Sequence, residues 1–321
     1  ATGAPDQPVE AKNGERLEAV EPVAWQATVD AYPRWSGSAA SQISIPLPTG
    51  WVVVPDGPSP YFMAGVKSGE MIRWSVFDVR TGSSVGSACE LPADSHFRPK
   101  LCSSGRYMSS YTGQGEERQV VVHSFVSGRQ VYAAESPTVR FGDTPRDCLA
   151  SNHRLVQLRG GDEDIELQWV DLRSGQVRSS WSVDSSDRDL ITIAVTPGGR
   201  DIVAVFRNEV EAYDLYGGRL VGRIRAPEGL SLEGAFAFTI DGTELALLGR
   251  EDDRPTPTLW CIDWETGETA LLANLHAEVH GLQNNYVFGP SLAWFPGKEL
   301  LLYYGRDVID RQTGKFCYQI P

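Results

Sequence analysis

Hydrophobic and polar residues alternate in short blocks between residues 195 and 225, and no block shows helical periodicity. Residues 202–206 and 210–214 are rich in β-branched and aromatic side chains, which favour strands. Turn-forming segments at 207–209 and 215–218 follow these two blocks. The last block alternates apolar and basic residues, which is typical of a strand with one buried face. The pattern predicts an antiparallel meander of four strands, the size of one propeller blade.

This unit recurs along most of the chain. Its second turn has the form Asp-x-x-x-Gly, in which the Asp side chain accepts turn amides and Gly supplies a positive φ. Six copies end at Gly82, Gly128, Gly175, Gly218, Gly267 and Gly314, spaced 43 to 49 residues apart, with Ser124 in place of Asp in the second copy. A first turn repeats in phase with the second, for example at 197–199 and 240–242. We therefore predict an all-β protein, a β-propeller of four-stranded antiparallel blades.

The number of blades is less directly encoded. Six repeats are explicit between residues 51 and 321, and two further strand candidates lie at 23–30 and 42–47. A ring of blades must protect its edge strands, so the N-terminal strands are expected to help close it. We favour seven blades with an atypical N-terminal closing blade, and six blades is the alternative. Residues 1–23 are expected to form an extended segment, and residues 24–321 a single propeller domain.

Three of the second turns resemble the end of a WD40-type repeat. They are Phe77-Asp-Val-Arg-Thr-Gly82, Val170-Asp-Leu-Arg-Ser-Gly175 and Ile262-Asp-Trp-Glu-Thr-Gly267. The resemblance covers about residues 51–321 and lacks both the Trp-Asp dipeptide and the Gly-His pair. The chain is thus similar to the wider WD40-like or quinoprotein-like propeller superfamily. Such propellers serve as interaction platforms, ligand binders or enzymes, and the fold alone does not choose among them.

One connection carries a candidate metal site. His276, Glu278 and His280 could meet a metal if this segment formed a helical turn, and an ordinary polar connection is the alternative. Residues 82–86 match the G-x-S-x-G pattern, but they fall in a predicted hairpin. A nucleophile elbow requires a strand-to-helix turn, so we expect no catalytic serine there.

Acidic clusters occupy two predicted hairpin tips. They are Asp162, Glu163 and Asp164, and Glu251, Asp252 and Asp253. Calcium binds carboxylates gathered in a tightly turned loop, but neither cluster has the spacing of an EF-hand. Exposed loop tips are also common binding sites for partners. We hypothesise that these six residues bind another protein.

Composition removes several classes of function. The net charge of −13 argues against nucleic acid as a partner, and no apolar run is long enough for a membrane span. The five cysteines include no CxxC pair, and a disulfide between Cys89 and Cys102 is left open. The chain contains no P-loop, dinucleotide fingerprint or tryptophan-docking motif of quinoproteins, so no cofactor is expected.

The resulting interpretation is a non-catalytic propeller that acts as an interaction scaffold or accessory domain for another protein or another domain. The alternative is a propeller enzyme or ligand binder, such as a lactonase-like metal-dependent hydrolase or a carbohydrate-binding protein with exposed tryptophans. The chain begins Ala-Thr-Gly without Met, which favours a processed protein in an extracytoplasmic location, secreted or periplasmic. A cytoplasmic location is the alternative.

Overall fold

The described part of the chain forms six four-stranded antiparallel sheets in a computed structural model. The structure describes residues 24–29, 51–53, 59–93, 99–113, 119–135, 147–150, 153–159, 164–184, 188–251, 256–275, 292–295, 299–303 and 307–319. In every sheet the strands follow one another in sequence order, so each sheet is a meander.

The strand bounds agree closely with the predicted repeats. The first sheet contains β1 (Trp51–Val53), β2 (Tyr61–Ser68), β3 (Met71–Asp78) and β4 (Ser83–Pro92), and the second contains β5 (Lys100–Leu101), β6 (Tyr107–Thr112), β7 (Gln119–Ser124) and β8 (Arg129–Glu135). The third contains β9 (Asp147–Ala150), β10 (Arg154–Arg159), β11 (Asp164–Asp171) and β12 (Gln176–Asp184), and the fourth contains β13 (Leu190–Val195), β14 (Asp201–Phe206), β15 (Glu209–Asp214) and β16 (Leu220–Arg225). The fifth contains β17 (Leu230–Phe238), β18 (Glu244–Glu251), β19 (Pro257–Asp263) and β20 (Thr269–Asn274), and the sixth contains β21 (Leu292–Trp294), β22 (Leu300–Tyr303), β23 (Asp307–Asp310) and β24 (Phe316–Gln319).

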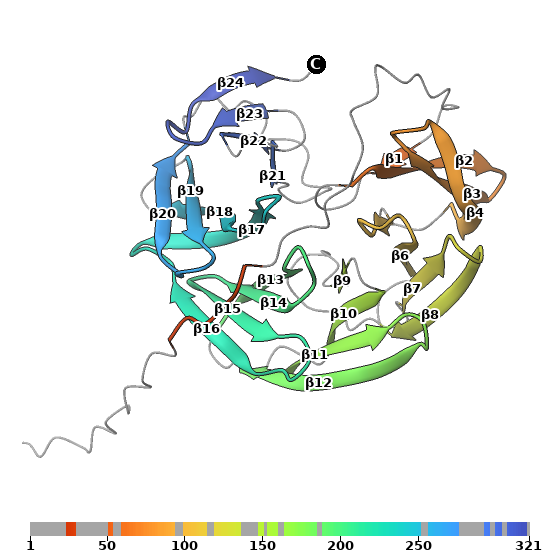
Figure 1. Ribbon diagram of the computed structural model, residues 1–321, viewed down its shortest axis with the longest axis horizontal. Helices are drawn as coiled ribbons and strands as arrows, with labels where there is room; N and C mark the ends of the chain where they lie inside the picture. The colour runs from red at the N-terminus through yellow and green to blue at the C-terminus, as the bar shows by residue number, and fades with distance from the viewer. Residues whose placement is uncertain are drawn as a thin grey trace, which may run out of the picture.

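The sheets are arranged around a common centre, with the first strand of each sheet near the centre and the fourth at the periphery (Figure 1). The predicted all-β architecture of four-stranded blades is thereby confirmed. The described residues supply six blades. Residues 24–29 form no strand, so the strand predicted at 23–30 is wrong for them, and residues 42–47 lie outside the described part of the chain.

The predicted second turn has the same geometry in all six sheets. The amide of the turn glycine donates to the carbonyl oxygen four residues earlier, at 2.7 to 2.9 Å, and the glycine φ lies between 64° and 74°. In the first sheet, Asp78 Oδ1 also accepts the amide of Arg80 at 2.8 Å. A bulge follows the turn in every pairing of third and fourth strands. The recurring Asp and Gly are therefore explained by hairpin closure.

The core lies between neighbouring sheets. The fourth and fifth sheets share one cluster that includes Val205, Leu247 and Trp260, all with 0% exposure. Similar clusters join the first sheet to the second, the second to the third, the third to the fourth, and the fifth to the sixth. Burial of apolar surface between the blades is thus the main force that orients one sheet against the next.

Candidate functional site

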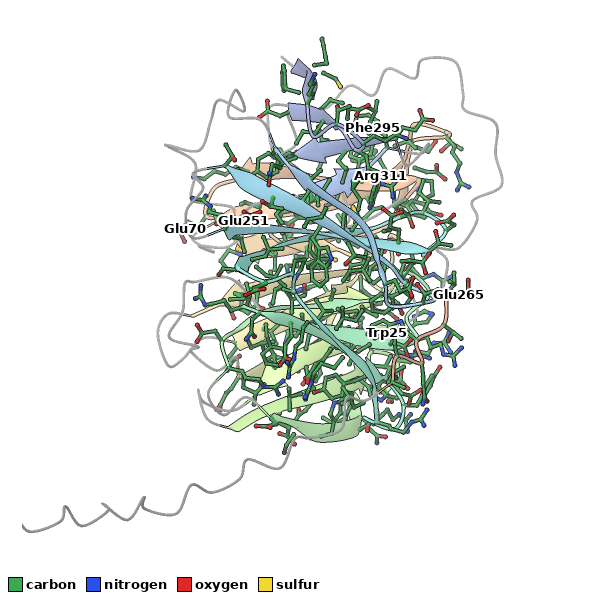
Figure 2. The ribbon with its side chains drawn as sticks, turned by 90° about the vertical axis from the view of Figure 1, so that its left-hand side faces the viewer. Trp25, Glu70, Glu251, Glu265, Phe295 and Arg311 are labelled. Atoms are coloured by element: carbon green, nitrogen blue, oxygen red, sulfur yellow. The ribbon has the colours of Figure 1, made fainter. Side chains whose placement is uncertain are left out.

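The molecule presents two faces that differ in the connections they carry. In a meander, the connections from second to third strands lie at one end of the sheet, and the two other hairpins lie at the opposite end. An edge-on view shows Glu70 and Glu251 on one side of the ring, and Glu265 and Trp25 on the other (Figure 2). Glu70 and Glu251 mark the face that carries the connections from second to third strands.

Five of the six second-to-third strand hairpins have an acidic residue in the part of the chain that the structure describes. These residues are Glu70, Asp164, Glu209, Glu251 and Asp307, and we call their common side the acidic face. Asp164 begins β11 and Glu251 ends β18, so these two residues of the predicted acidic clusters belong to this face. Asp162, Glu163, Asp252 and Asp253 lie outside the described residues.

These acidic residues differ in how far they reach solvent. Glu70 is exposed in the turn between β2 and β3. Glu251 is half-buried, and its Oε1 lies 3.5 Å from Thr258 Oγ1, which donates to it. Glu209 and Asp307 are buried. Among the four whose side chains are described, Glu70 and Glu251 are the ones that can meet a partner without rearrangement.

A buried charge network lies between the third and fourth sheets, next to the acidic face. Glu211 of β15 has no exposed surface, and its Oε1 accepts from Arg188 Nη1 at 2.8 Å and Arg223 Nε at 2.6 Å. Its Oε2 accepts the Tyr213 hydroxyl at 2.5 Å. Glu209 Oε1 accepts a second bond from Arg188 Nη1 at 2.5 Å. Two guanidinium groups and two carboxylates thus balance in charge, which makes burial of Glu211 tolerable.

The titration behaviour of this network is that of a structural site. Burial raises the pKa of Tyr213, and the adjacent Glu211 carboxylate raises it further. Burial opposes the charge on Arg188, but hydrogen bonds to Glu209 and Glu211 outweigh it and raise the Arg188 pKa. Tyr213 therefore stays protonated and Arg188 stays charged at neutral pH, whereas a general acid or base needs a pKa near the working pH. The sequence reading missed this network, although Glu209 and Glu211 alternate with Val210 and Ala212 along one strand.

A second ion pair lies on the fifth sheet, between Glu233 of β17 and Arg250 of β18. Burial raises the pKa of Glu233, and the charge of Arg250 opposes that shift. A carboxyl group with a raised pKa on the strand nearest the centre has the environment of a catalytic acid. In the described part of the chain, however, no group of three His, Cys, Asp or Glu is placed to hold a metal ion. The predicted metal residues His276, Glu278 and His280 lie outside that part.

Neither the described cysteines nor Ser84 has the surroundings of a catalytic nucleophile. Cys89, Cys102, Cys261 and Cys317 are all free, so the disulfide left open between Cys89 and Cys102 is not formed. Burial raises the pKa of the Cys89 thiol to about 11, which leaves little thiolate at neutral pH. Ser84 of the G-x-S-x-G match lies exposed within strand β4, as expected for a hairpin and not for a nucleophile elbow.

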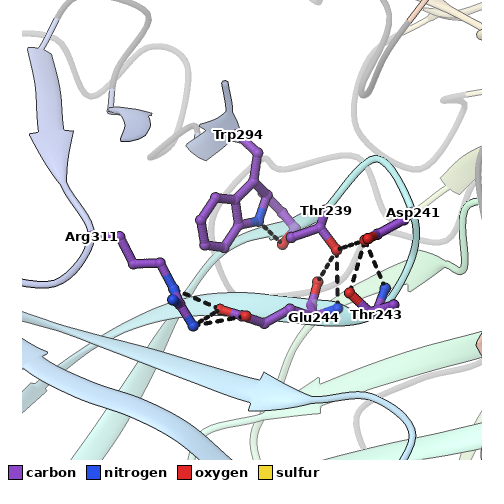
Figure 3. Close-up of polar contacts among 7 residues, drawn as sticks. Thr239, Asp241, Thr243, Glu244, Trp294 and Arg311 are labelled. Carbon is purple, nitrogen blue, oxygen red and sulfur yellow. Dashed lines mark hydrogen bonds and ion pairs between the residues drawn. The ribbon is translucent and has the colours of Figure 1, made fainter. Parts of the chain in front are cut away.

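Polar contacts also join the fifth and sixth sheets (Figure 3). Arg311, next to β23, forms a two-point ion pair with Glu244 of β18, with Nε to Oε1 at 3.0 Å and Nη2 to Oε2 at 2.8 Å. Trp294 Nε1 donates to the carbonyl oxygen of Ala237 at 2.9 Å. Cys261 lies close to the Glu244–Arg311 ion pair. Burial, and then the charge of Glu244, raise the pKa of its thiol. These residues fix one blade against the next and leave no unpaired charge to act on a substrate.

Comparisons with known proteins give the fold and no closer relationship. No protein-family model matches the chain, and no curated protein matches it either. Solved structures similar to it include Hsv2 from Kluyvelomyces marxianus, with 12% identity, a TM-score of 0.52, and coverage of 79% of this chain and 74% of that one. A second is hydrazine synthase from Kuenenia stuttgartiensis, with 17% identity, a TM-score of 0.51, and coverage of 86% and 80%.

A third similar structure is KlHsv2 with loop 6CD replaced by a Gly-Ser linker, with 13% identity, a TM-score of 0.51, and coverage of 79% and 73%. Identities this low indicate shared architecture only. Among the described residues, no helix is long and apolar enough to cross a membrane. The six meander sheets around one centre, together with these similarities, show that the chain has a β-propeller fold.

Proposed function

We propose that this protein is a non-catalytic β-propeller that binds another protein, or another domain, through its acidic face. The observation that supports the proposal is the placement of Glu70, Asp164 and Glu251 at the same end of three sheets, with Glu70 exposed and Glu251 half-buried. Carboxylates gathered on one face create a negative potential, and the net charge of −13 adds to it. The complementary partner is a protein surface rich in Lys and Arg.

The interior chemistry is consistent with this role. Glu211 and Glu244 are each held by arginine, and Glu233 is paired with Arg250. Each of these carboxylates is therefore paired with a guanidinium group of the protein itself, and the Glu244–Arg311 pair joins the fifth sheet to the sixth. By contrast, Glu70 stands in solvent at a hairpin tip, where rigid strands present it to a partner.

Three further features belong to the same proposal. The chain is a member of the WD40-like or quinoprotein-like superfamily, with seven blades, the last closed by N-terminal residues. Residues 24–321 form one domain, and the protein works outside the cytoplasm. A density map in which the blades can be counted tests the first feature, limited proteolysis tests the second, and cell fractionation tests the third.

The binding proposal is tested by reversing the charge of two residues on one face at a time. Glu70→Lys with Glu251→Lys reverses two charges on the acidic face, and Glu265→Lys with Glu268→Lys makes the same change in net charge on the opposite face. Partners recovered from the native extract by crosslinking to the wild-type protein are titrated against both variants. We expect affinity to fall at least about fivefold for the acidic-face variant only. Equal affinity for both variants, or a wild-type protein that stays monomeric in its native extract, would contradict the proposal.

A further inference from the structure

Residues 24–29 form an extended segment that starts at the periphery of the ring beside β16 and runs inward over the fourth sheet (Figure 1). Trp25 and Ala27 point inward, and Ala27 is only 5% exposed, whereas residues 24, 26, 28 and 29 are exposed. The Gln26 amide donates to the Val221 carbonyl oxygen at 3.1 Å. Alternate inward residues and a main-chain hydrogen bond are the features of a bound peptide in extended conformation.

The Trp25 side chain fills a slot between the fourth and fifth sheets, formed by Gly222, Gly267 and Trp264. Trp25 Nε1 donates to the Trp264 carbonyl oxygen at 2.9 Å, and the two indoles meet edge to face with centroids 4.8 Å apart. Trp264 is fully buried, and its ring also meets the Phe238 ring edge to face with centroids 4.9 Å apart. We call this site the Trp25 slot. Trp264 belongs to the core cluster shared by the fourth and fifth sheets.

The space next to the turn glycine is filled by different groups in the other sheets. A Cβ on Gly218 would lie 2.6 Å from Trp181 Cγ, and a Cβ on Gly267 would lie 2.6 Å from Trp25 Cγ. Trp181 belongs to β12, the outer strand of the preceding sheet. The turn glycines 128, 175 and 314 likewise meet the outer strand of the preceding sheet. Among the five turns whose neighbours are described, only that of Gly267 meets a side chain from outside the sheets.

Gly222 explains why the outer strand β16 does not fill the slot itself. Its backbone does not have the positive φ that would require glycine, but a Cβ there would lie 2.5 Å from Trp25 Cε3. Four residues after the turn glycine, the first and third repeats also carry small residues, Gly86 and Ser179, whereas the second, fifth and sixth carry Tyr132, Leu271 and Tyr318. At this interface the space beside Gly222 is occupied by Trp25, which lies 239 residues before its hydrogen-bond partner Trp264.

We propose that the Trp25 slot is a binding site for an extended peptide of the form Trp-x-Ala, occupied in cis by residues 24–29 and open to the same sequence in trans. The site accepts hydrogen bonds from the indole N–H and from the main-chain N–H of the next residue, and it buries a small side chain two positions after the tryptophan. None of the six sheet ladders includes residues 24–29, so the blades do not need the segment for their own pairing.

Tethering explains why the site is filled. The segment and the slot belong to one chain, separated from β1 by residues 30–50, so binding in cis is intramolecular and is favoured over binding of a free peptide. A free peptide therefore competes poorly with residues 24–29 for the slot in the intact chain. It should bind well once the Trp25 side chain is removed. The slot lies on the side of the ring opposite the acidic face (Figure 2), so this proposal does not depend on the proposed function.

The test uses the full chain with Trp25→Ala and a labelled synthetic peptide with the sequence of residues 21–30. Binding is followed by anisotropy of the label, because nine tryptophans in the chain obscure intrinsic fluorescence. We expect saturable binding to the Trp25→Ala protein, at least about tenfold tighter than to the wild-type protein. A peptide with alanine in place of tryptophan should not bind. Adding Gly222→Leu to the Trp25→Ala protein should abolish binding, because the leucine fills the slot.

The result that would overturn the proposal is a folded Trp25→Ala protein that does not bind the peptide. Equal binding with and without Gly222→Leu would also overturn it, because the peptide would then sit elsewhere. If Trp25→Ala prevents folding, the peptide is added during refolding. Recovery of the native circular dichroism spectrum supports a separable segment, and failure to recover it refutes one.

Discussion

Replacement of Glu211 by Gln should destabilise the propeller by about 3 kcal/mol. The change preserves shape but leaves two guanidinium groups, of Arg188 and Arg223, with Glu209 as their remaining carboxylate. Removal of one partner from a buried ion pair costs about 3–5 kcal/mol. The lower end applies because the Arg188 and Arg223 side chains keep 16% and 31% of their exposure and can still draw on water.

Urea unfolding followed by far-ultraviolet circular dichroism measures this loss as a shift of the midpoint at constant slope. In a thermal melt, the same loss corresponds to a fall in Tm of about 6 °C, at about 2 °C per kcal/mol for a large domain. Glu265→Gln, at an exposed turn, is the matched control and should leave the midpoint unchanged. A loss below about 1 kcal/mol for Glu211→Gln would refute the reasoning, because it would mean that the two arginines do not need this carboxylate.

Further outcomes follow from other buried groups. Burial lowers the pKa of His123, so stability present above about pH 6.5 is lost as pH falls toward the lowered value in the folded state. The fall in Tm between pH 7.5 and 5.5 should therefore shrink in His123→Gln, and an equal fall would contradict this. Iodoacetamide should modify the exposed Cys317 in the native protein and spare the buried Cys261, as read by peptide mass mapping. Arg311→Met should cost about 1–3 kcal/mol in urea unfolding and should not add to Glu244→Gln, since the two residues share one ion pair. Additive losses would argue against that pair.

The fold could be predicted because its signals are local. The turn from Asp214 to Gly218 closes through hydrogen bonds within four residues, so the same two residue types recur wherever the hairpin recurs. The strand predicted at 202–206 differs from β14 by one residue. Trp25 could not be placed in the same way, because its partners lie more than 190 residues away and no nearby pattern indicates them.

The positions of the hairpin residues in the candidate site could be predicted, but the buried charge network could not. Hairpin tips follow from the turns, so Asp164 and Glu251 could be assigned to connections, and their common face follows from the meander order. The charge network could not be predicted, because a one-residue offset decides which face of β15 carries Glu211. The alternation from Arg219 to Arg225 placed Arg223 on a polar face, and the structure turns its guanidinium toward a buried carboxylate.

The separation of 239 residues in sequence between Trp25 and Trp264 also determines when the segment can dock during synthesis. During synthesis, Trp25 emerges before any residue of its slot, so residues 24–29 can dock only after the fourth and fifth sheets have formed. Contacts that form after the folding transition state slow unfolding while leaving the folding rate nearly unchanged. The docked segment should therefore lengthen the lifetime of the native ring without speeding its assembly.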